Sequence, residues 1–312
     1  MKTRLTILPL LMVSVTIAIF GQSTDIAEKK IAITFEEIPF MKPLGFWRPR
    51  EISNIILRTL EQDKILAAGF VVQEKIENDT STYVILSDWV SRGHILGNQT
   101  WGDADFNVLT YDQFIEHLRD GQKYLSRVAK AEPFNYRYLR FPQLHEGNEP
   151  KKRKKLLKVL AKADYQVAHV SIKTLDWAFN QSYLEYEQDP TRLEALKEIY
   201  LGHLAEMLDY SEKQSLEVFG RNIPHILQLH CGIATAGFLG DTIKMLQERG
   251  YQFVSFPEAL SDSAYQTEEE YVGPLGLTFI DRVAATRGLP FDQDSGVPGE
   301  QEIRRRIASV ER

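Results

Sequence analysis

Residues 31–37 of the chain read Ile-Ala-Ile-Thr-Phe-Glu-Glu, an apolar run that ends directly in two acidic residues. An apolar run of this length, bounded by charge, is typical of a buried β-strand. Such a strand would place Glu36 and Glu37 at its carboxyl end. In folds built from parallel strands, the carboxyl ends are where binding and catalytic groups usually lie. We therefore expect a functional site at this strand end.

Six further strand-like runs follow, and helical patterns separate most of them. The strand-like runs cover residues 65–72, 94–100, 137–141, 166–172, 225–230 and 252–256. The helical patterns cover residues 49–63, 82–92, 110–131, 150–163 and 237–250. Repeated alternation of strand and helix predicts an α/β protein with a parallel sheet, either open or closed into a barrel.

Two parts of the chain depart from this alternation. Residues 181–221 form a long connection with apolar residues at helical spacing, which predicts a helical insertion. Beyond residue 260 the pattern fades, so we expect a C-terminal extension over residues 261–312. Within this extension, residues 271–280 should form a packed segment. From Gly296 onward, the chain should be a charged, loosely held tail.

The N-terminus has the pattern of a secretory signal peptide over residues 1–22. Basic Lys2 and Arg4 precede an apolar run over residues 5–20, which is short for a membrane span. We therefore expect an exported protein, either periplasmic or secreted, and the alternative is an uncleaved anchor. No second stretch is long and apolar enough to span a bilayer, so no membrane association is expected after cleavage.

Composition excludes several classes of protein. The 312 residues, 43% of them apolar, are enough to build one α/β barrel. With 43 acidic and 37 basic residues, the chain does not resemble a general nucleic-acid binder. Cys231 is the only cysteine, which excludes an intrachain disulfide and a multi-cysteine zinc site. The basic run over residues 151–155 is expected to be the solvated face of a helix, and the alternative is a surface that holds an anionic polymer.

Four more segments place polar residues at strand ends, in company with Thr34-Phe35-Glu36-Glu37. They are Gly-Asn-Gln-Thr-Trp-Gly-Asp at 97–103, Arg-Phe-Pro at 140–142, Leu-Asp-Trp at 175–177 and Leu-Gln-Leu-His at 227–230. In their order and spacing, these segments resemble the polysaccharide deacetylase (NodB-homology) family over roughly residues 30–260. The resemblance implies a distorted (β/α) barrel over residues 25–260, with a helical insertion near 181–221.

This resemblance also implies an activity and a partner. Family members are metal-dependent hydrolases of non-peptide carbon–nitrogen bonds, and they remove acetyl groups from N-acetylated sugars. The expected partner is therefore an N-acetylated oligosaccharide or polysaccharide, such as peptidoglycan or a chitin-like glycan.

The metal-ligand positions that the resemblance assigns are all substituted. Glu37, Gln99 and Asp103 stand where the family has Asp, His and His. Imidazole suits zinc, whereas carboxylate and amide oxygens suit harder ions such as magnesium, calcium or manganese. The longer Glu side chain also matters, because a misplacement of about 1 Å can cost on the order of 100-fold in rate. The sequence therefore disfavours zinc and leaves either a harder divalent metal or no metal.

The remaining catalytic positions match the family. Glu36 stands at the position of the base, although the family has Asp there, and Arg140 matches the arginine that holds this base ionised. Asp176 and His230 match an acid–histidine pair in which the acid raises the histidine pKa, so that the imidazolium protonates the leaving amine.

The expected substrate-binding residues are aromatic or follow Arg140 directly. Aromatic faces stack on sugar rings, so tryptophans at strand ends are expected to wall the groove. For either tryptophan, ordinary core packing is the alternative. The expected set is Trp101, Phe141, Pro142 and Trp177.

Two functions stay open on these residues. The first is a metal-assisted deacetylase-type hydrolase, and the retained Arg140, Asp176 and His230 favour it. The second is a family member that has lost catalysis and binds carbohydrate without cleaving it. Substitution at all three ligand positions favours this second function.

Overall fold

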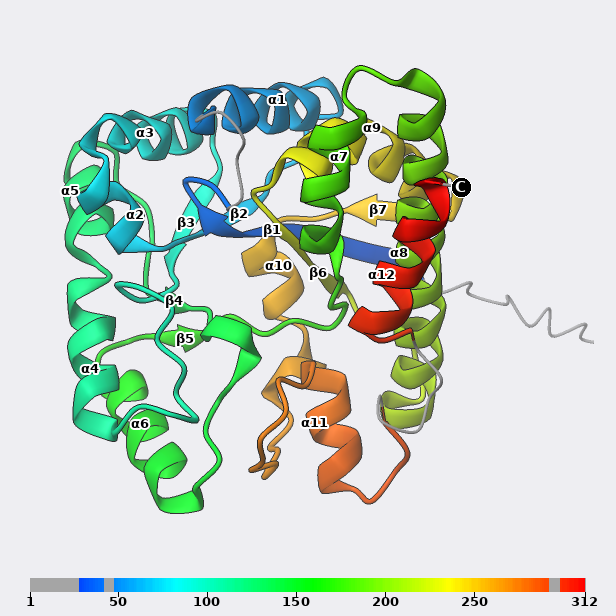
Figure 1. Ribbon diagram of the computed structural model, residues 1–312. Coiled ribbons are helices and arrows are strands. Elements are labelled where there is room, and N and C mark those ends of the chain that lie inside the picture. Colours follow the sequence, from blue (N-terminus) through cyan, green and yellow to red (C-terminus); the bar gives the residue numbers. More distant parts are fainter. Residues whose placement is uncertain (1–27, 42–47, 292–297, 312) are drawn as a thin grey trace, which may run out of the picture.

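The computed structural model describes residues 28–41, 48–291 and 298–311 (Figure 1). The proposed signal peptide over residues 1–22 lies outside this part of the chain. A parallel sheet forms the centre of the molecule, in the order β5-β4-β3-β2-β1-β6, with β7 also paired to β1. Its strands are β1 (Lys29–Ile38), β2 (Ala68–Val71), β3 (Ile95–Asn98), β4 (Tyr138–Leu139), β5 (Gln166–Val167), β6 (His225–His230) and β7 (Tyr251–Phe253).

The segment after β5 curls this sheet towards closure. Ile172 pairs in parallel with Leu227 of β6, although β5 itself pairs with β4 on the opposite side. The Gln228 amide donates to the Ile172 carbonyl at 2.9 Å, and the Ile172 amide donates to the Ile226 carbonyl at 3.1 Å. The strands therefore form a distorted barrel, which confirms the predicted fold class.

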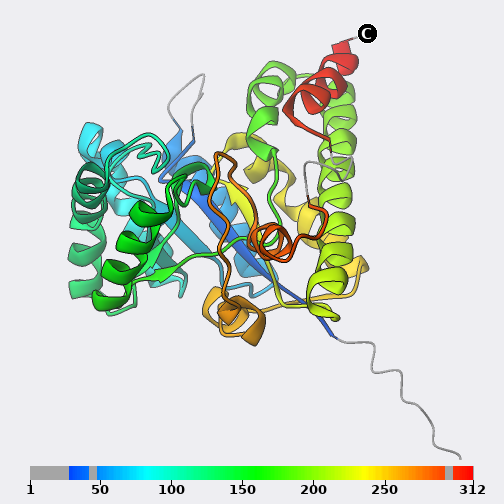
Figure 2. The same ribbon diagram turned by 90° about the horizontal axis from the view of Figure 1, so that it is seen from below.

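Helices surround the sheet on both sides (Figure 2). In the described part of the chain they are α1 (Pro49–Gln62), α2 (Gln73–Asn78), α3 (Tyr83–Ser91), α4 (Tyr111–Asp120), α5 (Lys123–Ala131), α6 (Pro150–Lys162), α7 (Asn180–Tyr186), α8 (Pro190–Phe219), α9 (Ile233–Glu248), α10 (Phe256–Leu260), α11 (Phe279–Thr286) and α12 (Glu300–Ala308). The sequence predicted helices at most of these places, but it did not predict α2, α10, α11 or α12.

The predicted helix over residues 110–131 is broken into α4 and α5 at Gly121. A Cβ atom at Gly121 would lie 2.5 Å from Asn98 Oδ1 and 2.6 Å from the Thr100 carbonyl carbon. Only glycine leaves room for this approach. The break therefore lets the end of α4 pack directly on the carboxyl end of β3.

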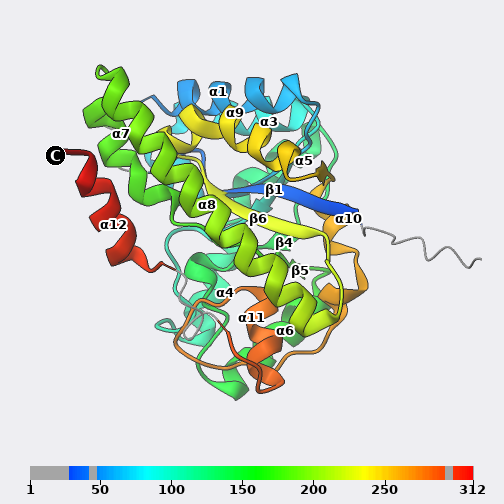
Figure 3. The ribbon, with the colours of Figure 1, turned by 90° about the vertical axis from the view of Figure 1, so that its right-hand side faces the viewer.

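The predicted helical insertion is confirmed as α7 and the long helix α8, which crosses one side of the barrel (Figure 3). Asp189 caps the start of α8 by accepting from the Arg192 amide at 3.1 Å. Gly220 ends it with a left-handed φ of 71°, a conformation that glycine adopts without strain. Among the described residues, no helix is long and apolar enough to cross a membrane.

The C-terminal residues differ from the expected loose tail. Helix α12 lies beside α8 (Figure 3). It buries Ile303 and Ile307 in a cluster with Leu196 and Tyr200 of α8. Arg306 also pairs with a glutamate of α8 at 2.9 Å. The two isoleucines lie four residues apart and share one face of the helix, so this charged segment still has an apolar stripe to pack. The boundary near residue 260 stays a prediction.

Candidate functional site

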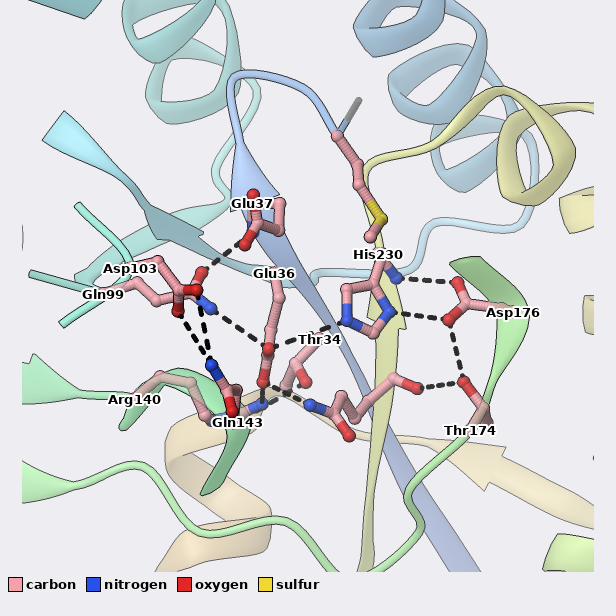
Figure 4. A network of polar contacts seen from close by, with 12 residues as sticks. Thr34, Glu36, Glu37, Gln99, Asp103, Arg140, Gln143, Thr174, Asp176 and His230 are labelled. Atoms are coloured by element: carbon pink, nitrogen blue, oxygen red, sulfur yellow. Dashed lines mark hydrogen bonds and ion pairs between the residues drawn. The ribbon is translucent and has the colours of Figure 1, made fainter. Parts of the chain in front are cut away.

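The strand ends that carry polar residues converge at one place in the barrel (Figure 4). Strand β1 supplies Glu36 and Glu37, and β6 supplies His230 directly opposite Glu36 in the parallel register. Gln99 follows β3 and Arg140 follows β4. Asp176, at the start of a 3₁₀ turn (Asp176–Phe179), bonds His230. The convergence that the sequence predicted is therefore present.

Glu36 lies at the centre of this network. Its Oε1 accepts from Arg140 Nη1 at 2.8 Å and from Gln228 Nε2 at 2.6 Å. Its Oε2 accepts from Gln99 Nε2 at 3.1 Å, and His230 Nε2 lies 3.8 Å from the same oxygen. Only 2% of Glu36 is exposed. The carboxylate is therefore held by three donors in a place that water scarcely reaches.

Arg140 crosses the interior of the barrel to reach Glu36. It is fully buried, its Nε donates to the Ala168 carbonyl at 2.7 Å, and its guanidinium lies 4.2 Å from the centre of the Phe70 ring. A buried charge is stable only when a partner and hydrogen bonds compensate for lost hydration. Arg140 therefore fixes the position of Glu36, as predicted.

Asp176 and His230 form a buried pair. Asp176 Oδ1 lies 2.6 Å from His230 Nδ1, and its Oδ2 accepts from the His230 amide at 2.7 Å and from Thr235 Oγ1 at 2.6 Å. Burial alone would lower the His230 pKa, but the Asp176 charge and hydrogen bond outweigh it and raise that pKa. The carboxyl pKa of Asp176 is lowered, since its burial is outweighed by the same pair and the hydrogen bonds. The geometry keeps a proton on Nδ1 and turns Nε2 towards Glu36.

Backbone strain gathers at the same strand ends. Glu37, Thr100, Gln143 and Leu144 have positive φ values of 65°, 70°, 57° and 57°. A left-handed conformation is unfavourable for residues with a Cβ atom, and such strain is most often found at functional sites. Glu37 lies at the end of β1, Thr100 follows β3, and Gln143 and Leu144 follow β4, so four of the six such residues in the described part of the chain lie around the site.

The side chains at the three expected metal-ligand positions all form hydrogen bonds with other groups of the protein. The Glu37 carboxylate accepts from Lys75 Nζ. Gln99 Oε1 accepts from the Glu37 amide at 2.8 Å, and its Nε2 donates to Glu36. The Asp103 carboxylate accepts from Gln143 Nε2 at 3.3 Å. Among the described residues there is no group of three or more His, Cys, Asp or Glu side chains that could hold a metal ion.

A match to a known family accounts for this arrangement of strand ends. The polysaccharide deacetylase family model matches residues 24–168, which include Glu36, Glu37, Gln99, Asp103 and Arg140. Over these residues, just under half of its length, the chain matches the polysaccharide deacetylase family. Asp176 and His230 lie beyond the matched range, and the structure joins them to the same site.

Solved structures with a similar fold include a CE4 family pseudoenzyme from Bacillus anthracis, at 15% identity and a TM-score of 0.47, over 75% of this chain and 66% of that chain. PdaA of Bacillus subtilis, a family 4 carbohydrate esterase, is 19% identical with a TM-score of 0.47, over 75% and 81% of the two chains. The Bc1960 peptidoglycan N-acetylglucosamine deacetylase is 18% identical with a TM-score of 0.48, over 78% and 90%. A comparison with curated proteins gives no match.

Members of the deacetylase family typically depend on a metal, and the residues present here do not fit one. The amide oxygen of Gln99 accepts a hydrogen bond from the backbone N–H of Glu37, and its amide nitrogen donates one to Glu36. Turning this side chain towards a cation would break both hydrogen bonds. Glu37 already faces the positive charge of Lys75. A divalent ion at this place would have to displace an ammonium group, and like charges repel strongly where water is scarce.

Lys75 and Gln228 are site residues that the sequence reasoning missed. Lys75 lies in the first turn after β2, whose end carried no expected motif, so applying the strand-end argument to β2 would have found it. Gln228 lies two residues before His230, and the same strand face therefore carries both side chains towards Glu36.

The expected substrate-binding residues divide into two groups. Trp101 and Trp177 are partly exposed, and the Trp177 ring lies 5.4 Å from the Arg304 guanidinium of α12. Phe141 is only 2% exposed and stacks on Phe114 at 5.5 Å, while Pro142 is also buried. The ring of Phe141 therefore belongs to the core rather than to a sugar-binding surface, because it completes an aromatic cluster beneath the β4 loop.

Burial decides the role of three further features of the chain. Cys231 is fully buried, which raises the thiol pKa to about 12 and makes it an unreactive packed residue. His94 accepts from the Ala67 amide at 3.0 Å, so it points into the core rather than the site. The basic run at the start of α6 is mostly solvated, but Arg153 turns inward to Glu146 and Glu269.

Proposed function

We propose that this protein binds an N-acetylated glycan at its strand-end site and does not cleave it by the metal-assisted route of its family. One observation carries the proposal. The Glu37 carboxylate accepts a hydrogen bond from Lys75, and both the oxygen and the nitrogen of the Gln99 side-chain amide are hydrogen-bonded to neighbouring residues. At two of the three family ligand positions, a cation would therefore have to displace an ammonium group from Glu37 or break the hydrogen bonds of the Gln99 amide. Peptidoglycan and chitin-like polymers are the glycans that fit the family's chemistry.

The state of Glu36 supports the same proposal. A general base must reach the proton that it takes, directly or through one water. Glu36 is buried, and Arg140, Gln228 and Gln99 already donate to its two oxygens. Each donor occupies a position on the carboxylate that a reacting water would need. The carboxylate thus acts as the anchor of a rigid polar network.

Retention of a shaped site supports binding. A buried polar network is costly to keep, and this one joins β1, β3, β4 and β6 through specific hydrogen bonds, although Gln228 Oε1 has no hydrogen-bond partner among the described residues. The strained residues around it would be expensive to keep at a surface without a role. Trp101 is partly exposed beside the same strand ends and offers an aromatic face for a sugar ring.

Hydrolysis without a metal is the second candidate function, and the Asp176–His230 pair favours it. An imidazole with a raised pKa carries the proton that a leaving amine would need. Its Nε2 is turned towards the site rather than towards the core.

One experiment separates these functions. The purified protein is titrated with N-acetylglucosamine oligosaccharides and peptidoglycan fragments by calorimetry, and acetate release is measured from the same mixtures with and without a chelator. Binding without acetate is the expected result. Acetate release that persists with chelator and disappears in His230→Ala would establish metal-free hydrolysis, and release that chelation abolishes would overturn the proposal. Absence of binding to every glycan would also overturn it.

We further propose that the chain is exported, on the strength of residues 1–22 alone. Cell fractionation with N-terminal sequencing of the recovered protein tests this. Recovery from the cytoplasm with residues 1–22 intact would contradict it.

A further inference from the structure

Lys75 holds an unusual place for a lysine. Its Nζ donates to Glu37 Oε2 and to the Phe40 carbonyl, the latter at 2.8 Å, and lies 5.6 Å from the Phe40 ring centre. Only 15% of its side chain is exposed, against 27% for Glu37. Lysine is rarely buried without a partner, because its ammonium is strongly hydrated. The Glu37 carboxylate supplies the compensation.

The backbone of α2 sets this position. The Val72 amide donates to the Ile38 carbonyl at 2.9 Å, which joins the start of α2 to the end of β1. The Glu74 amide donates to the Trp101 carbonyl at 2.5 Å, which joins the same turn to the loop after β3. Lys75 is therefore anchored between the two strand ends that carry Glu37 and Gln99, rather than swinging in from solvent.

The charges around Lys75 match those that a metal would meet. Glu37 contacts it. Burial lowers the pKa of Lys75 to about 8, which keeps the ammonium form in the majority at neutral pH, and the charge of Asp103 opposes this lowering. An ammonium is a compact positive charge with three N–H donors, so it can neutralise a carboxylate and still bind another oxygen. The described residues supply two acceptors for these three donors, the Glu37 carboxylate and the Phe40 carbonyl.

We infer that Lys75 is the resident cation of this site: it pairs with Glu37, keeps divalent metals out, and offers its remaining N–H to the acetamido carbonyl oxygen of the bound sugar. The inference rests on the proposed function for the identity of the ligand. Its metal-excluding part stands on the Lys75–Glu37 contact and is measured separately.

Metal binding gives the first test. Glu37→Asp, Gln99→His and Asp103→His are combined, once with Lys75 intact and once with Lys75→Met. A third protein combines the triple change with Lys123→Met, which removes an exposed lysine that pairs with Glu77 at 2.7 Å. Zinc affinity is measured by competition with a chromogenic chelator, and circular dichroism checks that each variant folds.

The expected result is that Lys75→Met tightens zinc binding by about tenfold or more, since removing one repelling charge in a poorly hydrated site is worth that much. Lys123→Met should change nothing. Equal zinc affinity with and without Lys75 would overturn the inference. If the triple variants do not fold, Lys75→Met and Lys123→Met are compared in the otherwise unchanged protein by manganese electron paramagnetic resonance. There, manganese binding that is no tighter in Lys75→Met overturns the inference.

Ligand binding gives the second test. Acetylated and deacetylated glucosamine oligosaccharides of equal length are compared in the original protein, in Lys75→Met and in Lys123→Met. The acetylated ligand should bind the original protein and Lys123→Met about tenfold more tightly than Lys75→Met, which should lose its preference for the acetyl group. Unchanged preference in Lys75→Met would overturn the carbonyl contact. If the original protein binds no glycan, the proposed function fails, and the zinc measurement alone decides the role of Lys75.

Discussion

At the scale of single residues, the site is organised around the buried ion pair of Glu36 and Arg140. Arg140 is completely buried, and most of its donors are used on the Glu36 carboxylate and on carbonyls of the strand-end loops. Breaking a buried pair leaves one charge without compensation, which is far worse than losing an exposed pair. The pair therefore contributes to the fold as well as to the site.

Removing Arg140 should destabilise the whole protein. We expect Arg140→Met to lower the free energy of unfolding by about 3–5 kcal/mol, because Glu36 would be left as an uncompensated buried carboxylate. Chemical denaturation measures the change. Adding Glu36→Gln should restore part of the loss, and a loss below about 1 kcal/mol in the single variant would contradict a structural role for the pair.

The Asp176–His230 pair makes a prediction about protonation. Asp176→Asn removes the charge that outweighs burial, so the pKa of His230 should fall from above its ordinary value to below it. Proton NMR of the imidazole measures this. Because the pKa of His230 is raised in the folded protein, its protonation adds to the free energy of unfolding below the unfolded pKa. This contribution is lost as pH rises through the folded pKa in the original protein, and it should be absent in Asp176→Asn. A His230 pKa that does not move would contradict the role of Asp176.

At the scale of elements, close approach decides where the helices start and stop. Gly121 separates α4 from α5 because its missing Cβ lets Asn98 and Thr100 approach, whereas Gly240 lies within α9 with no atom within 4 Å of an added Cβ. The same substitution should therefore have opposite effects at these two glycines.

We expect Gly121→Ala to destabilise the protein by about 1–3 kcal/mol, since the methyl group would push on the β3 end. Gly240→Ala should stabilise it by about 0.5–1 kcal/mol, because alanine is the better helix former. Thermal and chemical denaturation of both variants measure these changes. Effects of equal sign would contradict the packing described at Gly121.

Helix α12 shows how a charged segment becomes part of the fold. Ile303→Ala should open this helix locally, with the loss of about 2 kcal/mol or more of packing that buried isoleucines usually contribute. Hydrogen exchange of residues 300–308 measures the opening. Arg305→Ala, at a side chain that is 77% exposed, is the control and should leave exchange unchanged. Equal exchange in both variants would mean that α12 does not depend on Ile303.

At the scale of the whole molecule, several histidines are buried in neutral form. Burial lowers the pKa of His94, His203 and His225 to about 4 in each case. His94 and His203 accept backbone N–H bonds from Ala67 and Leu175, both at 3.0 Å, which protonation of the accepting nitrogen would break. His94 directly precedes β3, His203 lies in α8 and His225 lies in β6, so their effect is on the molecule and not on one site.

The protein should therefore lose stability in mild acid. A depressed folded-state pKa gives stability that is present above the unfolded pKa, about 6.5 for histidine, and is lost as pH falls towards 4. Each histidine should contribute on the order of 1–3 kcal/mol to this loss. Denaturation at pH 7, 5.5 and 4.5 measures it, and His225→Asn should flatten the curve. Constant stability over this range would contradict neutral burial.

The sequence by itself determined the alternation of strands and helices, the long helical connection and the convergence of five strand ends. Local patterns suffice there, because the period of apolar residues and the carboxyl-end rule depend on neighbours along the chain. Together with the family resemblance, these signals predicted that Glu36, Arg140, Asp176 and His230 share one site, and the structure brings the four side chains together.

Only the tertiary structure decided what those residues contact. That Gln99 turns its oxygen to the backbone, that Phe141 packs in the core and that α12 docks on α8 all depend on residues far away in the chain. Lys75 is the clearest case, since it lies 38 positions from Glu37 and no local pattern links them. This packing decides whether a carboxylate lies next to a metal ion or an ammonium group. A buried charge needs an opposite charge nearby, and the tertiary fold determines which group supplies it.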